Sequence, residues 1–306
     1  MQQGKLHQRI SLALFLSGSL LLASGQAIPD APASVRVAVS PPVSTVPTEV
    51  VGEVLAVDAV RNVIEINLGG VATQVEADPP AAEIFHPKAV VRGFLRPAAA
   101  AGLLPHLENL WPAHSELFDA QDRGIKALEA ALADSEKRLG TGSPFPFHAL
   151  MDERARMVTP ERFKGRELLV NFLYGRCSDP TMCSGTAQRM ASLHAVLPER
   201  LRARVEMVFV TLDPDFDTPA RCLQYLRNIG LDRPGFCMLT GPAAATEGLY
   251  RLCGLRMERF GDTGIQHTQV TFWIDAEGRM KGTFPGKNVS VDSMLQALLS
   301  GFTESQ

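Results

Sequence analysis

The second half of the chain alternates short apolar runs with segments of helical periodicity. Residues 167–174 form an apolar, aromatic run that predicts a buried β-strand. Residues 184–197 predict a helix, because apolar side chains recur on one stripe made of Ala187, Met190, Leu193 and Leu197. Further strands are predicted at 205–211, 236–239, 270–274 and 280–284, and further helices at 219–229, 243–253 and 291–299. This alternation, closed by a hairpin turn at 275–279, predicts a mixed α/β sheet flanked by helices.

The region before this domain, which we place at 144–306, has the periodicity of β-structure. In residues 48–97, Val, Ile and Thr alternate with polar residues, as in a half-exposed antiparallel sheet. The predicted strands are 49–57, 62–68, 72–75 and 89–95. A meander of this length predicts a small all-β, OB-like barrel.

Residues 98–143 change character again and predict a helical connector. Residues 98–104 and 117–139 are rich in helix-forming side chains. The second segment has an amphipathic stripe made of Ile125, Leu128, Leu132 and Leu139. A glycine-rich stretch ending in Pro144 stops this helix.

The first 27 residues have the pattern of a secretory signal. A basic start is followed by an apolar stretch at 10–23, and residues 25–27 offer a small-x-small cleavage site. An uncleaved anchor helix is the alternative, although the apolar stretch is short for a membrane span. Residues 28–47, rich in Pro, Ala, Ser and Val, predict an extended linker. Export predicts a periplasmic or extracellular location, where disulfides are permitted.

Composition adds one exclusion. The 306 residues are 45% hydrophobic and 21% charged, with a formal net charge of −3. This is ordinary globular composition, with room for one large domain and a smaller one. The near-neutral balance gives no electrostatic basis for binding nucleic acid.

Cys177 and Cys183 lie between a predicted strand and a predicted helix. Asp179 followed by Pro180 has the form of a helix N-cap with a first-turn proline, which places both sulfurs near the positive end of the helix dipole. This position, with Arg176 nearby, favours thiolate. A thiolate pair can cycle between dithiol and disulfide or hold a soft metal. The alternative is a structural disulfide, which gains little from closing so short a loop.

Other candidates are less specific. Five cysteines in an exported chain leave at least one thiol free, metal-bound or paired with another chain. Cys222, Cys237 and Cys253 lie in apolar surroundings and are predicted to be small buried hydrophobes, with a structural disulfide among them as the alternative. His267 precedes the strand predicted at 270–274, and loops at strand ends often carry function in α/β sheets. A loop histidine is otherwise a surface or capping residue.

Four segments match a known family in order and spacing. They are residues 163–174, the Cys177/Cys183 pair, residues 212–219 and His267 with Thr268. The segment Leu-Asp-Pro-Asp-Phe-Asp-Thr-Pro at 212–219, together with the later histidine, separates this family from ordinary thioredoxins. Over about residues 144–300 the chain resembles the Sco/SenC proteins. These are thioredoxin-like copper proteins linked to assembly of the binuclear copper site of cytochrome c oxidase.

The resemblance implies a thioredoxin-like fold and a copper ligand set of Cys177, Cys183 and His267. Two thiolates suit Cu(I), and an added imidazole makes Cu(II) acceptable. The implied function is a copper-binding chaperone that delivers copper to, or prepares, the copper-site subunit of cytochrome c oxidase, with that subunit or its assembly factors as partner. A thiol–disulfide oxidoreductase that reduces partner cysteines is the alternative, and it needs no histidine. A scaffold module with purely structural cysteines is a third.

The chain departs from the family pattern at the cysteines. The usual spacing is Cys-x-x-x-Cys, whereas here the segment is Cys-Ser-Asp-Pro-Thr-Met-Cys, two residues longer, and Ser184 follows where the family has proline. Met182 in this loop offers an alternative soft ligand, although a loop methionine more often packs. The barrel lies outside the resemblance. Because residues 48–97 contain no methionine or tryptophan, we expect no metal there.

The acidic segment has two interpretations. Asp213, Asp215 and Asp217 are either partners of the metal ligands or a docking surface, or they belong to a strand end and a helix cap. In the second case Asp217 or Thr218 caps the helix that begins at the following proline. We favour a capping role for Asp217.

Overall fold

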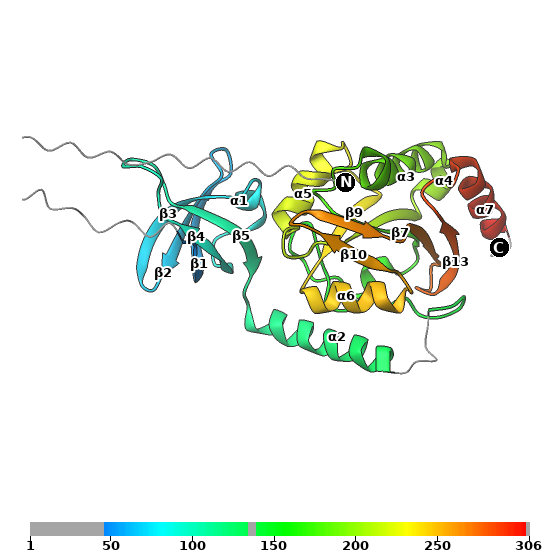
Figure 1. Ribbon diagram of the computed structural model, residues 1–306, viewed down its shortest axis with the longest axis horizontal. Helices are drawn as coiled ribbons and strands as arrows, with labels where there is room; N and C mark the ends of the chain where they lie inside the picture. Colours follow the sequence, from blue (N-terminus) through cyan, green and yellow to red (C-terminus); the bar gives the residue numbers. More distant parts are fainter. Residues whose placement is uncertain (1–45, 134–138, 304–306) are drawn as a thin grey trace, which may run out of the picture. The chain divides into compact units, whose positions relative to one another are not determined.

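The computed structural model describes residues 46–133 and 139–303 (Figure 1). The predicted secretory signal at 1–27, and all of the predicted linker except residues 46 and 47, lie outside the described residues. Within the described part, no helix is both long enough and apolar enough to cross a membrane.

Five strands at the N-terminal side form a sheet that closes on itself in the order β1-β2-β3-β5-β4. They are β1 (Thr48–Asp58), β2 (Val63–Leu68), β3 (Val71–Ala77), β4 (Val90–Arg96) and β5 (His106–Pro112), with the short helix α1 (Ala81–Ile84) between β3 and β4. Strand β1 pairs antiparallel with both β2 and β4, while β5 lies antiparallel to β4 and parallel to β3. Apolar side chains alternate inward, and Ile64, Ile66 and Leu107 are fully buried.

Strand β5 corrects the predicted helical connector. The structure has a strand at His106–Pro112 and no helix at 98–104, although both stretches lie in the region predicted as helical. Pro97 and Pro105 flank the first stretch, and Gly102 has a φ of +86°, which a helix does not allow. The hydrogen bonds of β5 go to β4 and β3, so the strand is defined by its pairing with them and its local composition gave no signal. This strand also gives the sheet a tryptophan, Trp111.

Helix α2 (Ser115–Ala133) confirms the second part of the connector. Leu128 on its predicted stripe is buried, and Ile125 and Leu132 pack against the core. The predicted helix residues 134–138 lie outside the described part. A Cβ at Gly124 would lie 2.7 Å from the Ala149 backbone nitrogen, so α2 needs a glycine to approach the segment before the second sheet.

The second sheet is mixed and has six strands in the order β13-β12-β7-β8-β9-β6. These strands are β6 (Met151–Asp152), β7 (Glu167–Leu173), β8 (Val205–Thr211), β9 (Phe236–Thr240), β12 (Val270–Ile274) and β13 (Met280–Pro285). Strands β7, β8 and β9 run parallel, and β6, β12 and β13 pair antiparallel with their neighbours. The predicted hairpin at 275–279 is confirmed, because it joins β12 to β13.

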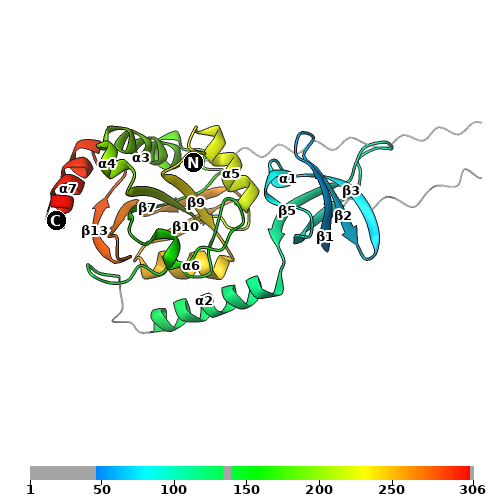
Figure 2. The ribbon, with the colours of Figure 1, turned by 180° about the vertical axis from the view of Figure 1, so that it is seen from behind.

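Helices cover both faces of this sheet (Figures 1 and 2). They are α3 (Gly185–Val196), α4 (Glu199–Arg202), α5 (Pro219–Asn228), α6 (Ala243–Leu252) and α7 (Val291–Thr303), with a 3-10 turn η1 (Pro160–Phe163) and a π-helical turn η2 (Pro180–Ser184). Every residue of β7 and β8 is buried, as in central strands covered on both faces. The predicted mixed α/β sheet flanked by helices is therefore confirmed.

Helix α5 also contacts the N-terminal sheet. Ala220 is fully buried in the apolar core of that sheet. The neighbouring Arg221 donates to Asp78 at 3.0 Å, and Arg227 donates to Glu83 at 2.8 Å. The acidic segment before α5 is thus attached to a helix that touches both sheets.

One element was missed by the sequence pattern. Strands β10 (Met257–Phe260) and β11 (Gly264–His267) form a separate two-stranded sheet that pairs with no strand of the six-stranded sheet. His267 is the last residue of β11 and does not lie in a loop. The position of this histidine therefore depends on how the hairpin is held.

Candidate functional site

The two cysteines lie where strand β7 gives way to α3. The side chain of Asp179 accepts a hydrogen bond from the Thr181 backbone nitrogen at 2.8 Å, which confirms it as the predicted N-cap, and Pro180 follows as the first residue of η2. Cys183 lies inside η2 and is fully buried, whereas Cys177 precedes the cap and is half-buried. Burial thus makes the two sulfurs unequal.

The pKa values of the two thiols also differ, with the more exposed Cys177 the more acidic. A hydrogen bond from the Cys183 thiol is the largest influence that lowers the pKa of Cys177, to about 5, and the Cys183 and Asp179 backbone amides add to it against the cost of burial. The shared hydrogen bond and burial raise the pKa of Cys183 well above its usual range. At neutral pH the pair is therefore one thiolate, on Cys177, stabilised by one thiol, on Cys183.

Arg176 does not have the role predicted for it. Its Nε donates to Asp213 Oδ2 at 2.6 Å, and its guanidinium lies 4.6 Å from the centre of the Phe216 ring. Asp213 is 1% exposed, so the arginine charge is balanced by a buried carboxylate. Hydrogen bonds, and not this cation, are the main reason that Cys177 is a thiolate.

Asp217 is a correction to the expected helix cap. The N-cap of α5 is Thr218, whose side chain accepts from the Arg221 backbone nitrogen. The Asp217 carboxylate, 1% exposed, instead accepts the Gly175 amide at 3.0 Å and the Thr211 hydroxyl. A Cβ at Gly175 would lie 2.7 Å from Asp217 Oδ1, so a larger residue there would displace this buried carboxylate. Burial raises the pKa of Asp217 to about 7, while its hydrogen bonds oppose the rise.

His267 presents one free ring nitrogen. Its Nδ1 lies 3.1 Å from the Thr268 carbonyl oxygen, which places the proton on Nδ1, and its Nε2 is buried without a hydrogen-bond partner among the described residues. Burial lowers the pKa of His267, against that hydrogen bond and the nearby charge of Cys177. The imidazole is therefore neutral, with its lone pair on a buried, unused nitrogen.

The three predicted ligands are only partly brought together. The two cysteines are hydrogen-bonded to each other, and His267 is close enough to Cys177 for its charge to act on the ring. Across residues 46–133 and 139–303, no three His, Cys, Asp or Glu side chains lie close enough together to hold a metal ion. Met182, the alternative soft ligand, is half-buried beside Cys183.

Two residues that sequence reasoning missed hold the histidine hairpin. The Tyr174 hydroxyl accepts from the Ile265 backbone nitrogen at 3.2 Å and lies 3.4 Å from the Ile265 carbonyl oxygen. Arg259 donates to Asp213 Oδ1 at 3.3 Å and to the Leu212 carbonyl at 3.1 Å. No sequence signal pointed to Arg259, because the hairpin that carries it was not predicted.

Comparison with known proteins identifies the family. The SCO1/SenC family model matches residues 134–301, just over half of the chain. The chain belongs to the SCO1/SenC family. A Stutzerimonas stutzeri protein named as copper-binding is 29% identical over 137 residues, which are 44% of this chain and 65% of that protein. The mitochondrial SCO1 homolog 1 of Arabidopsis thaliana is 23% identical over 210 residues, 67% of this chain and 59% of that protein.

The chain thus covers less than two thirds of the length of these two SCO1/SenC relatives. Among solved structures, Arabidopsis thaliana ScoI with copper bound is 22% identical, with a TM-score of 0.47. That match covers 54% of this chain and 99% of the other.

The remaining cysteines of this SCO1/SenC chain are free thiols. Cys222 and Cys237 are buried, and Cys253 is half-buried. Burial raises the pKa of all three thiols. Cys222 and Cys237 are the small buried hydrophobes that were predicted, whereas Cys253 is only partly buried. Cys177 is the one cysteine whose pKa is lowered.

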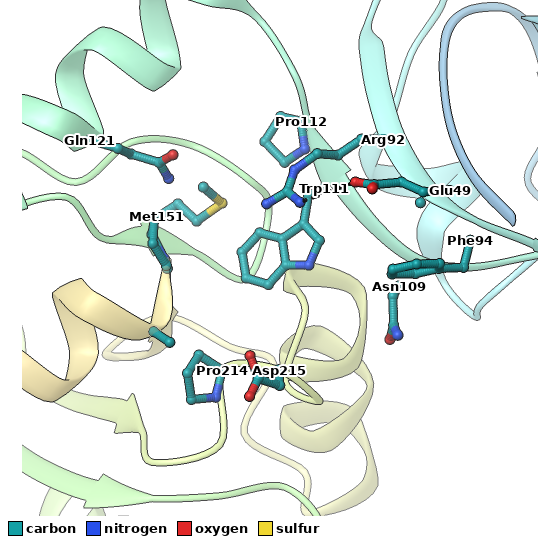
Figure 3. A pocket seen from close by; sticks show the side chains of 14 residues that line it. Glu49, Arg92, Phe94, Asn109, Trp111, Pro112, Gln121, Met151, Pro214 and Asp215 are labelled. Carbon is teal, nitrogen blue, oxygen red and sulfur yellow. Dashed lines mark ion pairs between the residues drawn. The ribbon is translucent and has the colours of Figure 1, made fainter. Parts of the chain in front are cut away.

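One cavity has no cysteine in its lining. It measures about 250 Å³ and is lined by residues of the N-terminal sheet, among them Arg92, Asn109 and Trp111, together with Met151 and Asp215 (Figure 3). The Nε of Arg92 and the Oδ1 of Asn109 are buried without hydrogen-bond partners in the described part of the chain. The three aspartates of the segment at 212–219 thus have different surroundings. Asp213 and Asp217 bind residues just before Cys177, while Asp215 borders this cavity.

The thiol asymmetry predicts a titration. In the reduced, metal-free protein, the ultraviolet absorbance of the Cys177 thiolate should be lost as the pH falls through about 5, far below the range of an ordinary thiol. Cys183→Ala should move this midpoint upward, because it removes the hydrogen bond that contributes most. Cys177→Ser is the control and should abolish the low-pH transition. A midpoint near 8 in the unmodified protein would contradict the described geometry.

Proposed function

We propose that this SCO1/SenC protein is an exported copper-binding chaperone that uses Cys177, Cys183 and His267 to deliver copper to, or prepare, the copper-site subunit of cytochrome c oxidase. One observation carries the proposal. A buried imidazole nitrogen that has no partner in the described part of the chain lies near a cysteine that is a thiolate at neutral pH. Family membership and the copper named for the Stutzerimonas stutzeri relative support it.

The chemistry of these donors fits copper. Thiolate sulfur and imidazole nitrogen are ligands that copper accepts in both oxidation states. Histidines that bind metals usually donate their other ring N–H to a carbonyl or carboxylate, as His267 Nδ1 does to Thr268. Leaving a buried polar atom without a hydrogen bond costs about 1–3 kcal/mol of folding free energy. Copper bound to Nε2 would supply the contact that this nitrogen lacks among the described residues.

The protonation and burial of the three side chains set the order in which they would bind copper. Cys177 is already a thiolate and is half-buried, so it offers the first sulfur to incoming copper. Cys183 holds its proton until a metal cation replaces it, so binding through both sulfurs releases a proton. His267 must then move toward the sulfurs, because the three side chains are not yet within ligand distance.

The strand order of the N-terminal sheet supports the proposal that this sheet is an OB-type barrel. Its five strands follow the order β1-β2-β3-β5-β4, with a short helix between β3 and β4, and β1 pairs with strands on both sides. Five strands closed in this way are typical of the OB type of barrel. The proposed export rests on the secretory pattern of residues 1–27.

Thiol–disulfide exchange is the second candidate function, and the unequal thiols favour it. A half-buried thiolate beside a buried thiol is the arrangement of an attacking and a resolving cysteine. The thiolate of Cys177 would attack a partner disulfide and displace one partner thiolate, which would take up the proton of Cys183. Cys183 would then break the mixed disulfide, forming a Cys177–Cys183 disulfide and leaving the partner with two thiols. This chemistry makes no use of His267.

The ligand set predicts separate effects for sulfur and nitrogen. Cys177→Ser or Cys183→Ser should abolish stable Cu(I) binding, because a hydroxyl is a poor ligand for this ion. His267→Ala should weaken Cu(II) binding more than Cu(I) binding, since two thiolates alone can hold Cu(I). Competition titrations with chelators for each ion measure both effects. Full Cu(I) affinity in the double serine variant, or equal losses of both ions in His267→Ala, would exclude this ligand set.

An assembly assay separates the two candidate functions. In a strain that carries His267→Ala, a copper chaperone should fail to support cytochrome c oxidase activity, while thiol exchange with a model disulfide stays intact. Cys177→Ser is the control that should fail in both assays. Normal oxidase activity with His267→Ala would remove copper delivery as the main function and leave the reductase.

A further inference from the structure

The histidine hairpin has no backbone pairing with the six-stranded sheet. Strands β10 and β11 pair only with each other, and the base of the hairpin is closed by a hydrogen bond from the Thr268 backbone nitrogen to the Arg256 carbonyl. A two-stranded hairpin is marginally stable by itself in water. Its position must therefore come from side-chain contacts with the rest of the domain.

Two sets of contacts supply this position from opposite strands of the hairpin. Tyr174, at the end of β7, binds the backbone of Ile265 on β11, two residues from His267. Arg259 on β10 reaches the carboxylate of Asp213 and the Leu212 carbonyl. Both strands are thus tied to the residues that directly follow the central strands β7 and β8.

Asp213 joins the hairpin to the cysteine loop. Its Oδ1 accepts from Arg259, and the same carboxylate accepts from Arg176, the residue before Cys177, at 2.6 Å. The carboxylate is 1% exposed, whereas Arg259 is 41% exposed at its side chain, so the acid is the fixed member of the pair. Tyr174 makes a second link, because its backbone carbonyl accepts a hydrogen bond from the Cys177 backbone nitrogen at 3.4 Å.

We propose that Tyr174, Asp213 and Arg259 form a clasp that positions the His267 hairpin relative to the cysteine loop. The clasp residues touch no metal and act through His267. They hold in place the hairpin that carries the imidazole, so that the ring stays within reach of the charge on Cys177. Without the clasp, the hairpin must be ordered each time the imidazole binds, and that entropy lowers affinity.

The clasp should therefore matter for Cu(II) more than for Cu(I). The inference rests on the proposed copper function for this part, because Cu(II) is the ion that needs the imidazole. Loss of a residue that orients a metal ligand typically costs about 10- to 100-fold in affinity. We expect a loss of about tenfold for Cu(II), with Cu(I) affinity nearly unchanged.

Two variants break the clasp at different points. Arg259→Ala removes the link to Asp213 without touching Cys177, and Tyr174→Phe removes only a hydroxyl from a ring that stays packed. Their controls are Arg256→Ala, an exposed arginine at the base of the hairpin with no side-chain hydrogen bond in the described structure, and Tyr250→Phe, on α6. Thermal unfolding of each variant checks that the domain remains folded.

The first measurement needs no copper. Hydrogen–deuterium exchange of residues 256–268 in the reduced, metal-free protein should be faster in Arg259→Ala and Tyr174→Phe than in the unmodified chain and in both controls. The other segments should exchange as before. Unchanged exchange of the hairpin in both clasp variants would overturn the proposal, whatever the copper results are.

The second measurement uses Cu(I) and Cu(II) ions in competition titrations. Both clasp variants should lose about tenfold in Cu(II) affinity and keep their Cu(I) affinity. Equal losses for the two ions, or no loss of Cu(II), would show that the clasp does not act through His267 and would overturn its positioning role. If the unmodified protein bound neither ion, the proposed function would fail, and the exchange result alone would decide whether the clasp exists.

Discussion

Two buried carboxylates hold the site together. The Asp217 carboxylate accepts a hydrogen bond from the backbone amide of Gly175, and the Asp213 carboxylate accepts one from the side chain of Arg176. Both donors lie just before Cys177. Each aspartate is 1% exposed, so each must be fully hydrogen-bonded to remain in the interior. Removing one partner of such a buried group costs more than the bond contributes, because a charge is then left unpaired. The backbone before Cys177 is therefore fixed before any metal or partner arrives.

The thiol pair built on this support is chemically unequal, which is why two functions fit it. The hydrogen bond that makes Cys177 a thiolate keeps the proton on Cys183. In a reductase this proton distribution prepares one sulfur to attack and the other to resolve. In a chaperone it prepares one sulfur to meet copper first. The buried Nε2 of His267 has no hydrogen-bond partner among the described residues, and only the proposed chaperone would use it.

The sequence was sufficient for elements whose pattern is local. The Asp179 cap, the helix after it and the alternating strands and helices were all predicted, because each rests on neighbouring residues. The strand β5 was missed because it is defined by its pairing with β4 and β3, and the hairpin was missed because β10 and β11 are only four residues long. Arg176 and Asp217 were expected near the cysteines, but as a cation that favours thiolate and as a helix cap. Their contacts, to Asp213 and to Gly175, depend on how β7 and β8 lie side by side.

The candidate ligands Cys177, Cys183 and His267 were identified from the family resemblance. How far apart they lie depends on the fold and could not be predicted from the sequence. The cysteine loop, two residues longer than the family pattern, still brings the two thiols into hydrogen-bond contact. The histidine stands on a hairpin held by side chains, so the proposed ligand set depends on the approach of His267 to the sulfurs.

X-ray absorption spectroscopy of the protein loaded with one equivalent of Cu(II) tests this account most directly. The account predicts two sulfur ligands and one imidazole nitrogen in the first coordination shell, with the nitrogen contribution lost in His267→Ala. A shell with no sulfur, or an imidazole contribution that survives in His267→Ala, would contradict it.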